Sequence, residues 1–508
     1  MEIKGMTVMK DAAVDAAAEK TLEGEIVIPD YLGDAARVIK AECRPRIISK
    51  KVSEGRLSVD CGAEICVWYW SEDSAVRVLR KNEEFYEEFT LDGAEKAVCL
   101  RTAVRTEFVN GYAVNSRKIG YKAVVAVSAR CSVKKAVSLF SPEGQTAFEC
   151  DPELLEISDL AASAEKNVSV SDVIELSQGR GEIKEIIKSD ATVFTTEMKS
   201  ITNKIITRGK AETKVIYLTP DGNIESVAAD IPFTQIIDIS GMDESSTADL
   251  RYTVNSVTAS PRADENGNMC RISVELDLTV LARGYRNVKA QAAVDAFSPA
   301  YAYELKKEKL CYERFDGSVE LTASDRGVAE TSETVAAVSD ASGTAVITGV
   351  RREGDRVTVG CAVNCAVIVK NSAGEPVALS RRFETSVSFE ADPAAESIRL
   401  EPEAKLVSLS YSITDDGRID VRYEVAVNAL VFTSFSTEVV VSAEADEGTP
   451  YVRKNKAPLV IYYAKKGDRI FDIAKSYRAS LKAVSDANGI ADGRISADRT
   501  VIIPIIKQ

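Results

Sequence analysis

Histidine is absent from all 508 residues of this chain. Without imidazole, no Ser–His or Cys–His pair can activate a nucleophile, and histidine cannot contribute to a metal site. A carboxylate-only mechanism remains open, because glycoside hydrolysis requires just two acids. The conspicuous acidic groups, at 264–268 and 415–417, instead have the Asp, Asn and Gly content of hairpin turns. We therefore predict a protein that is not an enzyme and that holds neither a cofactor nor a metal ion.

Long hydrophobic runs and targeting patterns are missing too. No stretch approaches 18 uninterrupted apolar residues, which argues against an integral membrane segment. The first 20 residues lack the basic-then-apolar order of a secretory signal, so we expect the protein to stay in the cytoplasm. The ten cysteines include no C-x-x-C pair, which favours buried thiols in a reducing compartment over disulfides or a metal site.

The composition, with 45% hydrophobic and 28% charged residues, is that of a globular protein with three or four domains. The net charge of −14 is unevenly distributed. Residues 458–508 carry nine Lys or Arg against five Asp, or +4, which leaves −18 for the remainder. So acidic a body makes nucleic-acid binding an unlikely function. The basic end is suited to an acidic protein surface, because opposite fields favour encounter.

The last 50 residues have the most specific pattern in the chain. A strand at 460–464 leads into a Gly-Asp turn, in which Asp468 is the expected N-cap of a helix. Apolar residues then recur at helical spacing. Ser480 is the expected cap of a second short helix, which Asn-Gly at 488–489 ends, and a strand at 500–503 returns.

This order, with the spacing Y-x4-GD-x4-IA-x2-Y-x10-NG and a final VIIP, resembles a LysM module, a family that binds ligands and does not catalyse. The resemblance implies a shallow groove for N-acetylglucosamine between the loop after the first strand and the loop before the last one. The corresponding positions are Gly467, Asp468, Arg469, Ile470 and Phe471 on one side, and Asn488, Gly489, Ile490 and Ala491 on the other.

The chain departs from the LysM pattern inside that groove. Arg469 stands where the family usually has Thr, and Ile470-Phe471 replaces a common Leu-Trp. Three interpretations stay open: the residues only hold turns and caps, the surface docks a protein, or the groove binds a glycan. The expected docking surface includes a basic face made of Lys465, Lys466, Lys475 and Arg478.

The rest of the chain repeats at a spacing near 148 residues. CVWYWSEDSAVRVLRKNEEF aligns with KVIYLTPDGNIESVAADIPF, which matches Tyr69 with Tyr217. Phe85 matches Phe233 at the same spacing, and a third, more divergent copy places Phe383 150 residues further on. We expect these five aromatic residues in the cores of three similar domains.

Within each copy, alternation with period two, as at 272–278, predicts strands. Asn-Gly, Asp-Gly and Glu-Gly turns are expected at 110–111, 221–222 and 353–354, and short helices near 34–40 and 182–188. For Trp68 and Trp70 a core position is favoured over an interdomain contact. The predicted fold class is mainly β, with three tandem antiparallel sandwich-like or barrel-like repeat domains and a small α+β (βααβ) LysM module.

Tandem β-rich repeats followed by one LysM module resemble the SPOCS-domain proteins of endospore-forming Firmicutes. Ile-Pro-Asp at 28–30 and Ile-Pro-Phe at 231–233 add to the resemblance. It implies a cytoplasmic scaffold on the mother-cell side, at the forespore or coat surface, which docks through its LysM module onto the ATPase that polymerises as the basement layer of the coat. The alternative is a wall protein that binds peptidoglycan or another GlcNAc-containing glycan and requires export.

The expected division follows from the repeat spacing and from composition. The stretch EADEGTPYVRKNKAP is polar and marked by Gly and Pro, as linkers are, and should let the LysM module move. The predicted parts are an N-terminal segment 1–20, repeats at 21–150, 151–303 and 304–445, a linker 446–458, and the LysM module 459–508.

Overall fold

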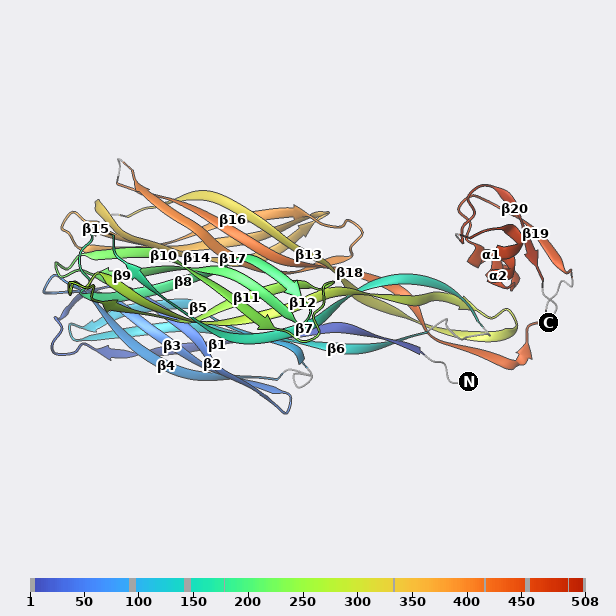
Figure 1. Ribbon diagram of the computed structural model, residues 1–508, viewed down its shortest axis with the longest axis horizontal. Helices are drawn as coiled ribbons and strands as arrows, with labels where there is room; N and C mark the ends of the chain where they lie inside the picture. The colour runs from blue at the N-terminus through green and yellow to red at the C-terminus, as the bar shows by residue number, and fades with distance from the viewer. Residues whose placement is uncertain are drawn as a thin grey trace.

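The computed structural model describes residues 5–90, 97–140, 148–177, 179–331, 334–414, 417–452, 457–491 and 493–505. Nearly all of this backbone is antiparallel β-sheet, and its two helices lie close to the C-terminus. Three packed domains form the body, and a narrow extension leaves one end of it (Figure 1). A small C-terminal module lies beside the far end of this extension.

Three successive groups of six strands share one topology: strands two, three and four of a group form one sheet, and the sixth strand lies between the first and fifth in another. The first repeat contains β1 (Gly5–Val27), β2 (Ala35–Ser53), β3 (Arg56–Ser71), β4 (Val76–Thr90), β5 (Ala97–Asn115) and β6 (Lys118–Phe140). The second contains β7 (Glu149–Glu175), β8 (Glu185–Ile201), β9 (Lys204–Leu218), β10 (Ile224–Asp238), β11 (Thr247–Arg262) and β12 (Arg271–Phe297). The third contains β13 (Tyr301–Ala329), β14 (Val335–Glu353), β15 (Arg356–Asn371), β16 (Pro376–Glu390), β17 (Ser397–Ile413) and β18 (Ile419–Pro450). The predicted fold class is confirmed.

Each repeat has its own hydrophobic core between its two sheets. Tyr69 and Tyr217 are fully buried there, and Phe85 and Phe233 are buried beside them, as expected. Phe383 is half-buried and stacks on Tyr423, with ring centroids 5.5 Å apart. It is not an equivalent position, because β4 and β10 begin nine residues before their phenylalanines and β16 begins seven residues before Phe383.

The two segments expected to hold short helices, 34–40 and 182–188, enter strands instead. β2 begins at Ala35 and has register shifts at Ala35/Arg37 and Val38/Lys40, and β8 has one at Ile186/Lys188. A bulge inserts an extra residue into one strand. The apolar positions then lose strict alternation and imitate the spacing of a helix, so the prediction was wrong.

The expected turn at Asn110-Gly111 is also absent, since both residues lie within β5. A Cβ atom on Gly111 would lie 3.1 Å from Ala41 Cβ and 3.2 Å from Val67 Cγ1, so glycine permits the two sheets to approach closely here. The turns at 221–222 and 353–354 do close hairpins. At 264–268 the chain turns as expected, whereas Asp415 and Asp416 lie outside the described residues.

The structure has strands running through the predicted domain limits. β1 pairs with β6 from Gly5 onward, so described residues of the segment 1–20 belong to a sheet of the first repeat. The limits at 150/151, 303/304 and 445/446 each fall inside a strand. β18 continues to Pro450, into the segment expected to be a linker.

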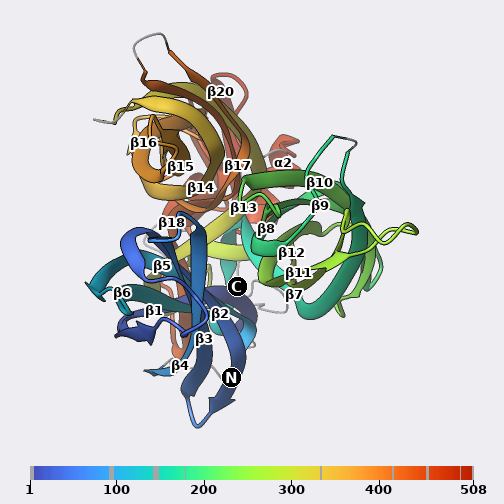
Figure 2. The ribbon, with the colours of Figure 1, turned by 90° about the vertical axis from the view of Figure 1, so that its left-hand side faces the viewer.

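The three repeats pack around a common centre, which is visible in the end-on view (Figure 2). Trp68 is 1% exposed and belongs to a hydrophobic cluster with Ile216 of β9 and Ile368 of β15. Its neighbour Tyr69 faces the core of the first repeat. The favoured prediction for Trp68 was therefore wrong: both faces of β3 are covered, and alternation alone cannot tell which face is turned toward another domain.

A buried ionic network joins the second and third repeats. Arg283 of β12 donates hydrogen bonds to Asp249 Oδ2 at 2.7 Å and to Glu401 Oε2 of β17 at 2.6 Å. Arg399 donates to Glu401 Oε1 at 2.8 Å and to Glu313. Arg283, Asp249 and Glu401 are all buried. Because each buried charge has a hydrogen-bonded partner of opposite sign, removing any one leaves the others uncompensated.

All three repeats contribute to the narrow extension, which we call the stalk. Its interior is lined by aliphatic residues from each repeat, among them Leu139 of β6, Leu155 of β7 and Val439 of β18. Near its end Phe140, Phe148 and Tyr303 form successive edge-to-face pairs. The stalk consists of the start of β1, which pairs with the end of β6, together with the ends of β7, β12, β13 and β18 (Figure 1).

We predict that Trp68→Ala destabilises the body by about 3–5 kcal/mol, because it leaves a cavity among three repeats. The measurement is the free energy of unfolding in denaturant. Tyr86→Ala, on the adjacent strand β4, is the control, since Tyr86 is 66% exposed and should change stability by roughly 0.5 kcal/mol or less. Equal effects of the two substitutions would contradict the interdomain role of Trp68.

A second prediction concerns the stability of the folded protein at low pH. Burial by itself would raise the pKa of Glu401, but Arg283 and Arg399 hold this pKa at about 2. Ionised Glu401 therefore stabilises the folded state by an amount on the order of 3 kcal/mol. This stabilisation is complete above the pKa of Glu401 in the unfolded chain, near 4.5, and is lost as the pH falls through about 2. The difference in unfolding free energy between wild type and Glu401→Gln should shrink over this range, and the exposed Glu320→Gln should show no such trend.

Candidate functional site

The C-terminal module has the predicted strand–helix–helix–strand order. It consists of β19 (Leu459–Ala464), α1 (Ile470–Tyr477), α2 (Leu481–Asn488) and β20 (Arg499–Pro504), with β19 antiparallel to β20. Apolar residues from all four elements form its core, including Ala464, Ile473, Val484 and Ile503.

The two helices differ in how the backbone groups at their ends are hydrogen-bonded. Arg469, rather than Asp468, occupies the N-cap of α1, and no side chain caps this helix. Asp468 instead accepts a hydrogen bond from the backbone N–H of Lys465 at 2.9 Å, which closes the preceding turn. The predicted capping role of Asp468 was wrong. For α2, the Ser480 hydroxyl accepts from Ala483 N and Gly489 is left-handed at the C-cap, as predicted.

A groove of about 340 Å³ opens beside α1. Of the predicted first wall, Gly467, Asp468 and Arg469 line it, whereas Ile470 and Phe471 are buried in the core. Six further residues that the sequence pattern did not predict also line the groove: Tyr462, Asp472, Ile473, Ser476, Tyr477 and Arg494. The spacing of Asp472 and Ser476, four residues apart on α1, is a signal that could have identified part of this face.

The predicted second wall, 488–491, does not line this groove. Asn488 is buried and structural: its amide donates to Val484 O and Ile502 O and accepts from Ile502 N. Gly489 ends α2, Ile490 is half-buried against the core, and Ala491 is exposed. For Asn488, the interpretation as a residue that holds local structure agrees with these contacts.

Three cations of the module face the stalk. Arg469 forms an ion pair with Asp151 of β7, and Lys475 forms one with Asp295 of β12. The hydrogen bond that the Arg469 guanidinium donates to Asp151 raises the pKa of Arg469. Although burial would raise the pKa of Asp295, hydrogen bonds from Lys475 and Lys307 hold that pKa below its usual value.

Arg478 and Phe471 complete this contact, which we call the stalk–module interface. The Arg478 guanidinium donates to the carbonyl oxygens of Ser298 at 2.7 Å and Tyr301 at 2.9 Å. It also lies 4.6 Å from the ring centroid of Tyr303. Phe471 packs edge-on against Phe297, with centroids 5.5 Å apart. Such an interface opposes the free movement expected of the module.

The predicted basic face is thus divided. Lys475 and Arg478, together with Arg469, contact the acidic body of the same chain, while Lys465 and Lys466 are exposed. A cation at the start of a helix gains nothing from the helix dipole, so the position of Arg469 requires a reason outside α1. In the structure, Asp151 of the stalk supplies that reason within the chain.

Side chains suited to catalysis or metal binding are not gathered in the described residues. No group of three or more His, Cys, Asp or Glu that could hold a metal is found there. Burial raises the pKa of the Cys66 thiol to about 12 and that of Cys365 to about 11, which makes both poor nucleophiles at neutral pH. Within the same residues, no helix has the length and hydrophobicity needed to cross a bilayer.

We predict that Arg469→Glu loosens the stalk–module interface, because it places a second negative charge beside Asp151. Hydrogen–deuterium exchange should become several-fold faster in 297–303 and in α1. The exposed Lys465→Glu is the control and should change neither segment. Combining Arg469→Glu with Asp151→Arg should restore slow exchange. Unchanged exchange in the single variant would show that this ion pair does not hold the module.

Comparison with known families locates two domains. The family model described as SipL, SPOCS domain, matches residues 182–261, from the segment before β8 almost to the end of β11 in the second repeat. The LysM domain model matches residues 462–504. No curated protein and no solved structure matches the chain.

These two domains are binding domains and not catalytic ones. A SPOCS domain is associated with sporulation, and a LysM domain suggests binding to peptidoglycan or a related glycan. The chain therefore combines a SPOCS domain in its second repeat with a C-terminal LysM domain, the architecture that its sequence resembles.

Proposed function

We propose that this protein is a non-enzymatic assembly scaffold of the spore envelope, which docks through its LysM module onto the basement-layer ATPase of the coat during sporulation. The observation that best supports protein docking is the outer face of the β19–β20 sheet. Four apolar residues on this face are 39–68% exposed: Leu459, Ile461, Tyr463 and Ile502. Large apolar side chains gathered on one exposed face are typical of protein contacts.

Charge near this face also favours a protein partner. Lys465 and Lys466 follow β19 directly and are exposed, whereas Arg469, Lys475 and Arg478 are engaged with the stalk. A partner with acidic residues around an apolar centre would match the two lysines and the sheet face together. The stalk would hold this surface away from the three cores.

The proposal predicts that Ile461→Asp, in the full-length chain, weakens binding to the basement-layer ATPase by about tenfold or more, since a charge replaces an apolar contact. Biosensor kinetics should show the loss mainly as faster dissociation. Ile236→Asp on β10 is the matched control, because Ile236 is also exposed, at 50% against 68% for Ile461, but lies on the body. Wild-type affinity in the Ile461 variant would remove the sheet face from the docking surface.

The alternative function, binding of a GlcNAc-containing glycan, is favoured by one feature of the groove. Tyr462 and Tyr477 line it and lie edge-to-face, with ring centroids 6.0 Å apart, close to Asp468 and Asp472. Aromatic faces with nearby polar groups suit a sugar ring. A sedimentation assay of the full chain with insoluble peptidoglycan separates the two functions. Robust retention at physiological salt that Tyr477→Ala abolishes would favour the glycan.

A further inference from the structure

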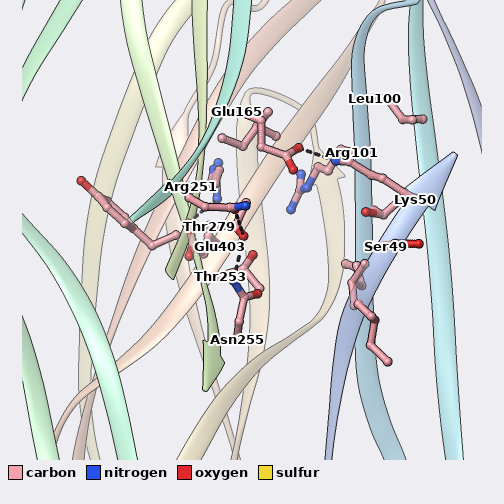
Figure 3. Close-up of a pocket in the computed structure, with 17 residues that line it drawn as sticks. Ser49, Lys50, Leu100, Arg101, Glu165, Arg251, Thr253, Asn255, Thr279 and Glu403 are labelled. Carbon is pink, nitrogen blue, oxygen red and sulfur yellow. Dashed lines mark hydrogen bonds and ion pairs between the residues drawn. The ribbon is translucent and has the colours of Figure 1, made fainter. Parts of the chain in front are cut away.

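A cavity of about 320 Å³ lies where the three repeats meet, far along the chain from the LysM module. The first repeat supplies its lining from β2 and β5, the second from β7, β11 and β12, and the third supplies Glu403 of β17. In Figure 3, Arg251, Thr253, Asn255 and Thr279 lie on one side, and Ser49, Lys50 and Leu100 lie on the other.

Much of the lining can form hydrogen bonds. Asn255 Nδ2 donates to the Thr279 hydroxyl at 2.8 Å, and this hydroxyl donates to Asn167 Oδ1 at 2.9 Å. The Asn167 Nδ2 group donates no hydrogen bond within the described residues, so it is available to an acceptor. Hydroxyls from Ser49, Thr102 and Thr253 add to this polar lining.

Two of the three cations in the lining have carboxylate partners of their own. Lys50 pairs with Glu165 across the boundary between the first and second repeats. Arg251 donates to Glu403 at 2.7 Å and to the carbonyl oxygen of Glu401 at 2.9 Å. These cations are therefore neutralised within the protein.

Arg101 of β5 is the exception. It forms no hydrogen bond with any described residue, and its nearest ion-pair contact is Glu401 Oε2 at 4.0 Å. Arg283 already donates to that same oxygen at 2.6 Å. The Arg101 side chain retains 35% of its accessible surface, and the residue lines the cavity.

The surroundings of Arg101 compensate its charge only in part. Burial lowers its pKa, repulsion from Arg251 and Arg283 lowers it further, and attraction to Glu401 and Glu403 offsets this only partly. A guanidinium stays charged at neutral pH, so it needs an anion or water to offset the lost solvation. Its planar fork matches the two oxygens of a carboxylate or phosphate group.

We propose that this cavity binds a small oxyanion, the carboxylate or phosphate group of a free metabolite, through the Arg101 guanidinium and the Asn167 amide. This ligand site is separate from the proposed LysM docking surface and does not depend on it. Because all three repeats line the cavity, a bound anion would stabilise their assembled arrangement.

The test uses the full-length chain, with inorganic phosphate and succinate as separate probes and sodium chloride at matched ionic strength as the reference. Calorimetric titration gives the affinity, and thermal unfolding gives the shift in Tm. Phosphate and succinate distinguish the two sources of oxyanion. The variant is Arg101→Gln, and the control is Arg105→Gln on the same strand, where Arg105 is exposed and pairs with Glu107.

We expect saturable binding of at least one probe to the wild type and to Arg105→Gln, with a rise in Tm. Arg101→Gln should bind that probe about tenfold more weakly or not at all, because a charged hydrogen bond is lost. Without anion, its Tm should be no lower than that of the wild type, since the uncompensated charge is gone.

Three results would overturn the proposal. One is no saturable binding of either probe to the wild type. Another is unchanged affinity in Arg101→Gln. The third is a Tm several degrees lower for Arg101→Gln in the absence of anion, which would give Arg101 an ordinary structural role.

Discussion

The outward faces of β3, β9 and β15 meet at the centre of the body, and the remainder of the architecture depends on this contact. Trp68, Ile216 and Ile368 bring one strand from each repeat into a shared hydrophobic cluster. The cluster turns three separate sandwiches into one body. Beyond this centre, strand ends from all three repeats, among them those of β6, β7, β12, β13 and β18, meet in a stalk with its own apolar interior.

The stalk in turn determines what the LysM module can present. The acidic body and the basic module attract each other within one chain, and their contact is made specific by Asp151 and Asp295 on the stalk. Phe297 adds an apolar anchor for Phe471. This arrangement uses three cations of the module internally and leaves the β19–β20 face, with its neighbouring lysines, turned toward solvent.

The charged groups at the junction of the repeats form a buried network, whereas those at the stalk tip pair the module with the stalk. Glu401 is surrounded by arginines and is held ionised far below its usual pKa range. Arg101, which is partly exposed, faces a polar cavity and, among the described residues, has only the distant carboxylate of Glu401 as an ion-pair partner. The chemistry proposed for this cavity is electrostatic recognition of an anion.

Local patterns in the sequence were sufficient to predict most strands, the three similar copies, the order of elements in the LysM module, and the burial of Tyr69 and Tyr217 in the cores. These features arise from period-two and helical spacing and from turn residues, all of which act over a few positions. Contacts between distant segments were beyond such reasoning. Alternation along β3 could not show that Trp68 faces two other repeats, bulges in β2 imitated a helix, and no spacing linked Arg469 to Asp151. Those pairings were decided by the tertiary structure, because they depend on which sheet faces cover one another once the whole chain has folded.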